Sequence, residues 1–407
     1  MVEVEVLAGS RSIGGNFVKI KDRDVAVIFD QGVRFDIMNK YYSMHITPQS
    51  LQELRALGIL PQPEWYDDAE HVYITHMHLD HLGALSNIPK EMTVHLPSMK
   101  VYEQQESRWK LSPTWTALLP RKYYVSVEEL KPLEEDQNNV MPVPVSHSAY
   151  PSYALLYFGR DETILYTGDF RLEGFLTKRE YSSIYGCGSL LEFLEENRDI
   201  KVEKLIIEGT NFGSDRFPLP PEDAIKTIRR ILSNHSPVIA TIHSLDLEYA
   251  LALLKLASEL NIKCYIVSES IAKLMEDSAN LPTEPEAIEE YVQNLSFLKK
   301  RPIAGTEDRS IYLVSYREIV DFIRSLASHE KLSSNMAAIL SEPEPQAEES
   351  TEYDIIANWF SRMQINAYRV RVSGHYYPYQ LKTILEIIKP KKIIPVHTLN
   401  PQYLRSL

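Results

Sequence analysis

The sequence predicts an α/β protein with two domains, and three observations lead to this prediction. Residues 222–314 alternate between helical segments and short strands that are apolar on both faces, as in a parallel sheet covered by helices. The first part of the chain instead begins with short strands separated by turn residues. A chain of 407 residues is also long enough to form two hydrophobic cores.

Short apolar runs separated by turn residues indicate a β-meander over residues 1–35. Gly14-Gly15-Asn16 separate the first two runs, and Lys21–Asp24 separate the last two. A polar segment with an amphipathic helix follows, and we take its His45 as a surface residue. The elements expected in this part of the chain are the strands Val2–Leu7, Phe17–Ile20, Val25–Phe29 and Met92–Leu96 and the helices Ser50–Leu57 and Ser98–Trp109.

Three histidines and an aspartate lie within six positions directly after the apolar run Val72–Ile74. In an extended segment, side chains two residues apart project to the same face, so His76 and His78 can bind one ion together. Asp80 and His81 then lie where the chain turns out of the strand, directed at a second ion. Imidazole and carboxylate suit zinc best. A purely structural polar strand end explains so dense a cluster poorly.

Two further candidate ligands follow predicted strands later in the chain. His147 comes after the strand Val140–Val145, and its position alone fits a structural residue as well as a ligand. Asp169 follows a hairpin formed by Tyr153–Phe158 and Thr163–Tyr166. A carboxylate there can bridge two cations and neutralise part of their charge, or it can be a simple turn residue.

The alternating helices and strands after Glu208 predict the second domain. An acidic loop at residues 341–352 follows them and is expected to be solvated. The end of the chain then returns to a histidine-bearing pattern, with His375 and His397 each placed after a strand. The helices expected are 222–234, 245–260, 271–279, 286–298 and Gln380–Ile388, and the strands are Lys204–Ile207, Val238–Ile242, Cys264–Val267, Ile311–Val314, Tyr368–Val372 and Lys391–Val396.

Composition limits the cellular context and the class of partner. With 44% hydrophobic and 24% charged residues and no long apolar run, the chain is expected to be globular, without a membrane partner. Its beginning lacks the basic segment of a secretory signal, and Cys187 and Cys264 lie far apart, so we expect a cytoplasmic protein. The net charge of −13 argues for a small basic groove if the partner is a nucleic acid.

The order of these residues resembles the metallo-β-lactamase superfamily. His76-Met77-His78-Leu79-Asp80-His81 resembles its His-x-His-x-Asp-His motif, and Gly168-Asp169 resembles its Gly-Asp motif. The resemblance implies a four-layer αββα sandwich with the metal site at one edge. It also implies two zinc ions, with manganese as the alternative. One ion would take His76, His78 and His147, and the other would take Asp80, His81 and His397, with Asp169 between them.

Three further motifs resemble the β-CASP nucleases of that superfamily. Glu208 corresponds to their motif A, Ser373-Gly374-His375 to motif B, and Pro395-Val396-His397 to motif C. The chain opening and the Ser-Gly-His and Pro-Val-His segments look most like ribonuclease J, and the resemblance is to the archaeal type. The resemblance implies a metallo-β-lactamase domain over residues 1–208 and 366–407, with an inserted β-CASP domain over residues 209–365.

The resemblance further implies a metal-dependent ribonuclease, in the first place a 5′→3′ exonuclease with endonuclease activity as an addition. The partner would be single-stranded RNA, including 5′-monophosphorylated RNA, and the oligomeric state stays open, with a homodimer as one option. The catalytic residues would be Asp80, Glu208 and His375, and the RNA contacts would come from Ser373, Gly374 and His375. In this scheme His375, oriented by Glu208, protonates the departing oxygen.

The chain departs from the family pattern at three places, one of them the end of only ten residues after His397, and two other functions stay open. Tyr376 and Tyr377 replace small residues, and these rings could stack on bases. Residues 240–244 lack the usual Gly-Arg turn of the inserted domain. A small-molecule metallohydrolase would use the same metals without needing His375, and a non-catalytic RNA-binding subunit would need neither.

Overall fold

The computed structural model describes most of the chain. The described residues are 2–23, 25–42, 46–109, 125–213, 218–278, 309–328, 332–342 and 353–405. Three expectations lie outside them: the surface position of His45, the helix expected over residues 286–298, and residues 343–352 of the acidic loop.

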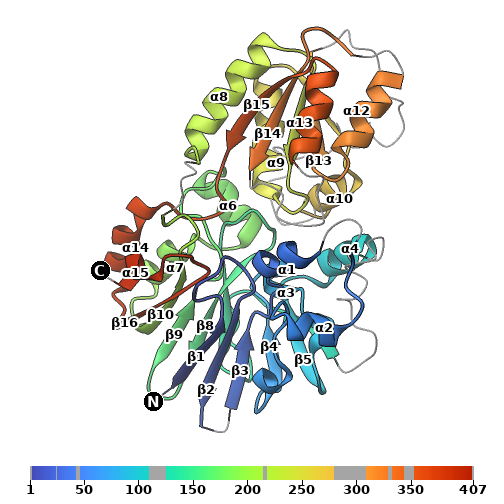
Figure 1. Cartoon of the computed structure of the whole chain (residues 1–407). Coiled ribbons are helices and arrows are strands. Elements are labelled where there is room, and N and C mark those ends of the chain that lie inside the picture. The colour runs from blue at the N-terminus through green and yellow to red at the C-terminus, as the bar shows by residue number, and fades with distance from the viewer. Residues whose placement is uncertain are drawn as a thin grey trace. The chain divides into compact units, whose positions relative to one another are not determined.

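The chain forms two compact units (Figure 1). Unit 1 comprises Met1–Leu172, Gly188–Asp215 and His375–Leu407, and unit 2 comprises Glu173–Cys187 and Arg216–Gly374. From the sequence, residues 173–187 and 366–374 were expected in the first domain and residues 209–215 in the second, whereas the compact units place them the other way round. Strand β15 (Asn366–Arg371) instead pairs in parallel with a strand of unit 2.

Unit 1 contains two sheets. The first has six strands in sequence order: β1 (Glu3–Ala8), β2 (Phe17–Asp22), β3 (Val25–Phe29), β4 (His71–Tyr73), β5 (Met92–Leu96) and β6 (Val125–Glu129). The second runs in the order β16 (Lys392–Val396), β10 (Val202–Glu208), β9 (Thr163–Tyr166), β8 (Tyr153–Phe158) and β7 (Val140–Pro144). The antiparallel meander β1–β2–β3 and the β8–β9 hairpin confirm two predictions from the sequence.

The two sheets of unit 1 pack face to face through one hydrophobic core. Phe29 and Tyr73 of the first sheet share this core with Tyr166 and Ile206 of the second. The opposite face of the second sheet packs against α7 (Leu190–Glu196) and α14 (Leu381–Ile388). In Figure 1 the helices α1 (Phe35–Tyr41), α2 (Leu51–Ala56), α3 (Leu79–Leu82) and α4 (Met99–Trp109) lie on the side of the first sheet. Unit 1 is therefore a layered α/β sandwich.

Unit 2 is built on the parallel sheet that the sequence predicted. Its five strands run in the order β12 (Lys263–Ile266), β13 (Ser310–Ser315), β11 (Val238–Ile242), β14 (Ala337–Glu342) and β15, all parallel. Its helices are α6 (Lys178–Tyr185), α8 (Pro221–Asn234), α9 (Leu247–Glu259), α10 (Glu269–Ser278), α12 (Ile319–Ser328) and α13 (Tyr353–Arg362). Apolar side chains of α12 and α13 share a core with β11, β13 and β14.

Two helix starts carry signals that the sequence analysis did not use. Thr177 with Glu180 and Ser189 with Glu192 form capping boxes at the beginnings of α6 and α7. Each pair satisfies backbone N–H groups that the first helical turn leaves open. None of the described helices is long and apolar enough to cross a membrane.

The turn that carries Asp80 and His81 is held by two loop segments, one before β2 and one after β3. Gly15 N donates to Asp80 O at 2.9 Å, and Gln31 N donates to His81 O at 2.7 Å. Gly32 lies so close to this turn that a Cβ atom would stand 1.6 Å from Asp80 O. Since that neighbour is backbone, no side-chain rotation can relieve the clash, and only glycine fits here.

We expect Gly32→Ala to displace the turn at Asp80. Forced overpacking of this kind typically costs about 1–3 kcal/mol, so the free energy of unfolding in urea should fall by at least that amount. Retention of added zinc should fall with it, because the turn carries two candidate ligands.

The matched control is Gly58→Ala. Gly58 has φ +71°, and the nearest atom to an added Cβ is Ile37 Cδ1 at 3.8 Å. This variant should lose about 1 kcal/mol through backbone strain alone and keep its zinc. Wild-type stability and zinc retention in Gly32→Ala would show that the close approach is not required.

Candidate metal centre

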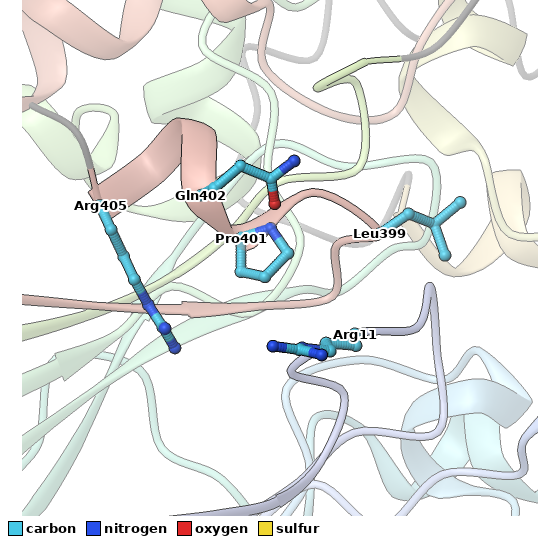
Figure 2. Close-up of a pocket in the computed structure, with 5 residues that line it drawn as sticks. All are labelled: Arg11, Leu399, Pro401, Gln402 and Arg405. Atoms are coloured by element: carbon cyan, nitrogen blue, oxygen red, sulfur yellow. The ribbon is translucent and has the colours of Figure 1, made fainter.

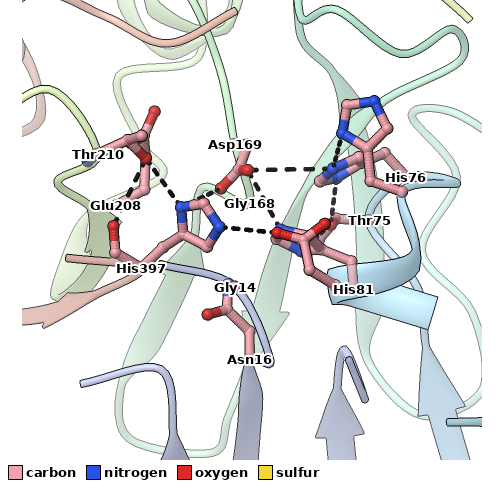
Figure 3. A network of polar contacts seen from close by, with 12 residues as sticks. Gly14, Asn16, Thr75, His76, His81, Gly168, Asp169, Glu208, Thr210 and His397 are labelled. Carbon is pink, nitrogen blue, oxygen red and sulfur yellow. Dashed lines mark hydrogen bonds and ion pairs between the residues drawn. The ribbon is translucent and has the colours of Figure 1, made fainter. Parts of the chain in front are cut away.

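The residues that could hold metal lie where the strands of unit 1 end. His76 and His78 follow β4, His81 lies in α3, Asp169 follows β9 and His397 follows β16. Figure 3 shows His76, His81, Asp169 and His397 converging on one another, joined by the contacts drawn as dashed lines. The two sheets therefore deliver their polar residues to one edge of the sandwich.

The first group of potential ligands consists of three imidazoles. His76, His78 and His147 each offer a ring nitrogen, and these atoms lie within 4.8 Å of one another. His76 Nε2 lies 3.1 Å from His78 Nδ1, and His147 Nε2 lies 3.3 Å from the same atom. Nitrogen lone pairs at such distances repel unless a proton or a cation lies between them.

The second group combines a carboxylate with two imidazoles. Atoms of Asp80, His81 and His397 also lie within 4.8 Å of one another. Asp80 Oδ2 is 3.2 Å from His397 Nε2 and 3.9 Å from His81 Nε2. The sequence separates Asp80 from His397 by most of the chain, so only the fold creates this group.

Asp169 contacts members of both groups. Its Oδ2 lies 3.1 Å from His81 Nε2 and 4.0 Å from His76 Nε2, and its Oδ1 lies 3.5 Å from His397 Nδ1. The Asp169 side chain is 2% exposed, and among the described residues Oδ1 has no hydrogen-bond partner. A buried carboxylate oxygen without a hydrogen bond is costly, and a divalent cation would satisfy it.

These residues fit two divalent cations. Imidazole nitrogens and carboxylate oxygens are the donors that zinc takes, and manganese accepts the same set. Cations bound here would satisfy the buried Asp169 oxygen and separate the facing nitrogens of the first group. The structure thus brings together all seven residues for which the sequence predicted a metal-ligand role, and those roles stay predictions.

Asp30 orients His81, a function that the sequence analysis missed. Asp30 Oδ2 lies 2.7 Å from His81 Nδ1 and accepts a hydrogen bond from Tyr166 Oη at 2.7 Å, and Oδ1 accepts one from Thr75 N at 2.8 Å. With Nδ1–H donating to Asp30, His81 presents Nε2 to the site. The available signal was an aspartate directly after the buried strand β3.

Thr210 orients His397 as Asp30 orients His81, and the sequence did not reveal this function either. Its Oγ1 lies 2.8 Å from His397 Nδ1 and donates to Glu208 Oε2 at 2.7 Å. The hydroxyl oxygen of Thr210 therefore accepts a hydrogen bond from His397 Nδ1–H, and Nε2 of His397 faces Asp80. No motif marks Thr210, because its contact depends on a strand that comes near the end of the chain.

The predicted catalytic pair lies beside the second group. His375 Nδ1 is 3.0 Å from Glu208 Oε1 and 3.9 Å from Asp169 Oδ2. The Glu208 side chain is 1% exposed, and its backbone oxygen accepts a hydrogen bond from Tyr376 Oη at 2.8 Å. Glu208 and His375 also lie close enough to share a metal ion with the second group. One ligand atom each of Asp169, Glu208, His375 and His397 lies within 4.8 Å of the others.

Stacking of RNA bases on Tyr376 was a wrong expectation. The Tyr376 side chain is fully buried and packs against Phe170 and Phe212, with ring centroids 5.1 and 5.9 Å away. Tyr377 is buried too, and its ring stacks on Tyr379 at 5.6 Å. Tyr376 is buried because its ring packs into the core of unit 1. The substrate contacts expected from Ser373, Gly374 and His375 stay predictions.

Burial and neighbouring charges shift the ionisation of the cluster in opposite directions. Burial, aided by the neighbouring imidazoles, lowers the pKa of His76 well below its usual value. Burial also opposes a charged His81, but the carboxylates of Asp169, Asp30 and Asp80 outweigh it and raise the pKa of His81 well above the usual value. Burial likewise opposes ionisation of Asp80, yet His81 and His397 lower its pKa to about 2.

These features define the chain as an α/β sandwich protein with a candidate two-cation centre. It is a distant relative of proteins named ribonuclease J. The ribonuclease J of Helicobacter pylori is 22% identical over 418 residues, which cover 97% of this chain and 56% of that protein. The chain thus spans little more than half the length of this relative. The Pyrococcus abyssi ribonuclease J is 27% identical over 104 residues, covering 25% of this chain and 22% of that protein.

Two other proteins match this chain over a larger share of their own length. The Methanocaldococcus jannaschii protein named "Probable RNase MJ4" is 23% identical over 332 residues, covering 76% of this chain and 68% of that protein. A crystal structure of a protein of unknown function from Enterococcus faecalis V583 superposes with a TM-score of 0.70 at 20% identity, covering 98% of this chain and 95% of that one. This likeness shows a shared fold. No protein-family profile matches the sequence.

We expect Asp30→Asn to weaken metal binding without removing a ligand. The amide would place a donor opposite His81 Nδ1–H and disturb the ring orientation, and loss of such outer partners typically costs about 10–100-fold in metal affinity. Competition with a coloured chelator measures this change.

Asp36→Asn is the control, because Asp36 is an exposed carboxylate that pairs with Arg34 at 2.8 Å, outside the cluster. The metal affinity of Asp36→Asn should equal that of the wild-type protein. Equal affinities for Asp30→Asn and wild type would exclude the orienting function of Asp30.

Metal affinity should rise with pH. The raised pKa of His81 means that its ring holds a proton in the metal-free protein near neutral pH, and a cation must displace that proton. Below that raised pKa, one displaced proton increases the apparent affinity by about tenfold per pH unit. Chelator competition at several pH values measures the slope, and calorimetry in buffers of different ionisation enthalpy counts the protons. An affinity independent of pH would contradict the proton on His81.

Proposed function

We propose that the chain is a metal-dependent ribonuclease that hydrolyses RNA phosphodiester bonds. The observation that carries this proposal is the pair His375–Glu208, 3.0 Å apart, placed next to the two ligand groups. A metal centre alone is common to many hydrolases. A second, carboxylate-paired imidazole beside it provides a proton donor of the kind that cleavage of a phosphodiester requires.

The fold supports the finer assignment. In this proposal unit 1 is a metallo-β-lactamase domain, and the parallel sheet of unit 2 belongs to a β-CASP domain inserted between β10 and β16. The names of the relatives, ribonuclease J and RNase MJ4, favour RNA as the substrate. As in the sequence analysis, the substrate would be single-stranded RNA, including 5′-monophosphorylated RNA, attacked by a 5′→3′ exonuclease with endonuclease activity as an addition.

Two zinc ions, or manganese ions, would be held by the two ligand groups with Asp169 between them. When bound, such ions lower the pKa of water and offset negative charge on a phosphate. The protein residues hold the ligands in place: Asp30 fixes the ring of His81, and Thr210 fixes the ring of His397. Both rings then keep Nε2 directed at the centre.

His375 would supply the proton for the departing oxygen. Burial opposes its charged form, but the carboxylates of Glu208 and Asp169 outweigh that effect and raise its pKa. Because Nδ1 faces Glu208, Nε2 would be the ring nitrogen that delivers the proton to a substrate. Glu208 is itself fixed, since Thr210 N donates to its Oε2 at 2.9 Å. The pair thus keeps a protonated imidazole in one orientation, which favours general acid catalysis.

Replacing His375 should separate metal binding from catalysis. His375→Ala is expected to keep two ions per chain and to lose about 10²–10⁴-fold in the cleavage rate, the usual contribution of a general acid. Glu208→Gln should lose less, because the imidazole remains, whereas Asp80→Ala should lose both metal and activity. Single-turnover cleavage of 5′-monophosphorylated RNA, beside elemental analysis of each variant, provides the comparison.

His235→Ala is the matched control. His235 lies in unit 2, where its Nε2 is 2.7 Å from Tyr368 Oη, and its removal should change neither metal content nor cleavage. Wild-type cleavage by His375→Ala would overturn the proposed proton donor and favour a small-molecule metallohydrolase. Binding of RNA without cleavage by the metal-loaded wild type would instead favour a non-catalytic RNA-binding subunit.

A further inference from the structure

Unit 1 has a pocket whose lining residues are not among the candidate metal ligands. It has a volume of about 530 Å³ and is lined by Arg11, Leu399, Pro401, Gln402 and Arg405. Arg11 comes from the loop between β1 and β2, and Arg405 ends α15 (Pro401–Arg405). Figure 2 shows both guanidinium groups pointing into the same space beside α15. Its volume lies in the range of small-molecule sites.

The charge of this pocket is opposite to that of the chain. Among the described residues, its lining contains two arginines and no carboxylate side chain, although the chain carries a net charge of −13. Neither Arg11 nor Arg405 forms an ion pair with a carboxylate in the part of the chain that the structure describes. Two guanidinium groups directed at one space repel each other, because arginine stays charged at every physiological pH. An anion between them would remove that repulsion.

A phosphate group fits this arrangement best. The planar guanidinium donates paired hydrogen bonds that match the oxygens of phosphate. Leu399 adds an apolar surface at the same pocket, with 60% of its side chain exposed, beside Pro401. Exposed apolar atoms next to two cations favour a phosphate that carries an organic group, such as a ribose or a base, over a bare inorganic ion.

Both walls of the pocket are continuous with segments of the candidate metal centre. Leu399 follows His397 by two residues, and Asn400 is fixed by its Nδ2 hydrogen bond to Phe212 O at 2.9 Å. On the other wall, the loop that carries Arg11 is anchored where Gly15 N donates to Asp80 O at 2.9 Å. The arginines are therefore displayed from backbone that is already held in place, and little ordering is required on binding.

We propose that Arg11 and Arg405 bind a phosphate group of the RNA chain next to, but distinct from, the phosphate that is cleaved. This inference rests on the proposed ribonuclease function. The pocket would hold the RNA backbone in register on an acidic protein by means of a local pair of positive charges. The same chemistry would also accept a free 5′-nucleotide, and the experiment below separates these two sources.

The test uses the full chain with the arginines replaced by glutamine. Arg11→Gln, Arg405→Gln and the double variant keep side-chain length and hydrogen-bonding groups and remove the charge. Binding of a fluorescent phosphorothioate polyuridine, which resists cleavage, to the metal-loaded protein is followed by anisotropy over salt from about 50 to 200 mM. Binding of AMP is measured by calorimetry in parallel, and thermal unfolding and zinc content check the fold of each variant.

We expect the double variant to bind polyuridine about tenfold more weakly at low salt and with a shallower salt dependence. Each lost phosphate contact should reduce the slope of log K against log salt by about 0.7 for a single strand. Arg160→Gln, at the exposed β8–β9 turn and therefore at the opposite strand ends from the metal centre, should bind like wild type. Arg11→Lys, which keeps the charge, should retain most of the slope.

Three other outcomes are decisive. If the double variant loses AMP binding but keeps polyuridine binding, the pocket holds the phosphate of a free nucleotide. If neither ligand is affected, the pocket is not a phosphate site, and the proposal is overturned. If wild type binds and cleaves no RNA at all, the ribonuclease function itself fails, and the AMP measurement alone then decides for or against the pocket.

Discussion

The burial of carboxylates among imidazoles is the constraint on which unit 1 depends. Asp30 is fully buried and Asp169 nearly so, and they face the two ring nitrogens of His81 at 2.7 and 3.1 Å. A buried carboxylate without such a partner costs several kcal/mol, as order of magnitude. The surrounding loops must therefore hold each partner in register. The contact between Gly32 and the Asp80 backbone is one consequence, because it leaves no space even for a methyl group.

Sheet topology explains how residues so distant in sequence meet. Strands β3 and β4 are parallel neighbours, so Asp30 and His76 emerge at the same edge of the first sheet. Strands β9, β10 and β16 are parallel neighbours in the second sheet, which places Asp169, Glu208 and His397 side by side at their ends. Face-to-face packing of the two sheets then closes the site. Rigid strands position the ligands, so the chain needs no long loop to reach them.

The acidic composition and a nucleic-acid substrate are compatible once charge is considered locally. A net charge of −13 describes the whole chain, whereas a bound phosphate responds to groups within about one Debye length, some 8–10 Å. Two cations at the metal centre and the two guanidinium groups of the pocket would both lie in unit 1. The net negative charge of the rest of the protein would also limit nonspecific binding of other nucleic acid.

The sequence by itself determined the local features. The dense His-x-His spacing after an apolar run marked His76 and His78 as candidate ligands, although both lie in the bend that follows β4 and not on the strand itself. Continuous apolar runs were enough to indicate the parallel sheet of unit 2. It also indicated all seven candidate ligands, because each follows a recognisable strand or motif. The contacts of Asp30 with His81, across 51 residues, and of Thr210 with His397, across 187 residues, were decided only by the tertiary structure. So were the burial of Tyr376 and the placement of Arg11 and Arg405 at one pocket. Periodicity is a property of neighbouring residues, whereas these contacts depend on how two sheets and their loops pack, which no local pattern records.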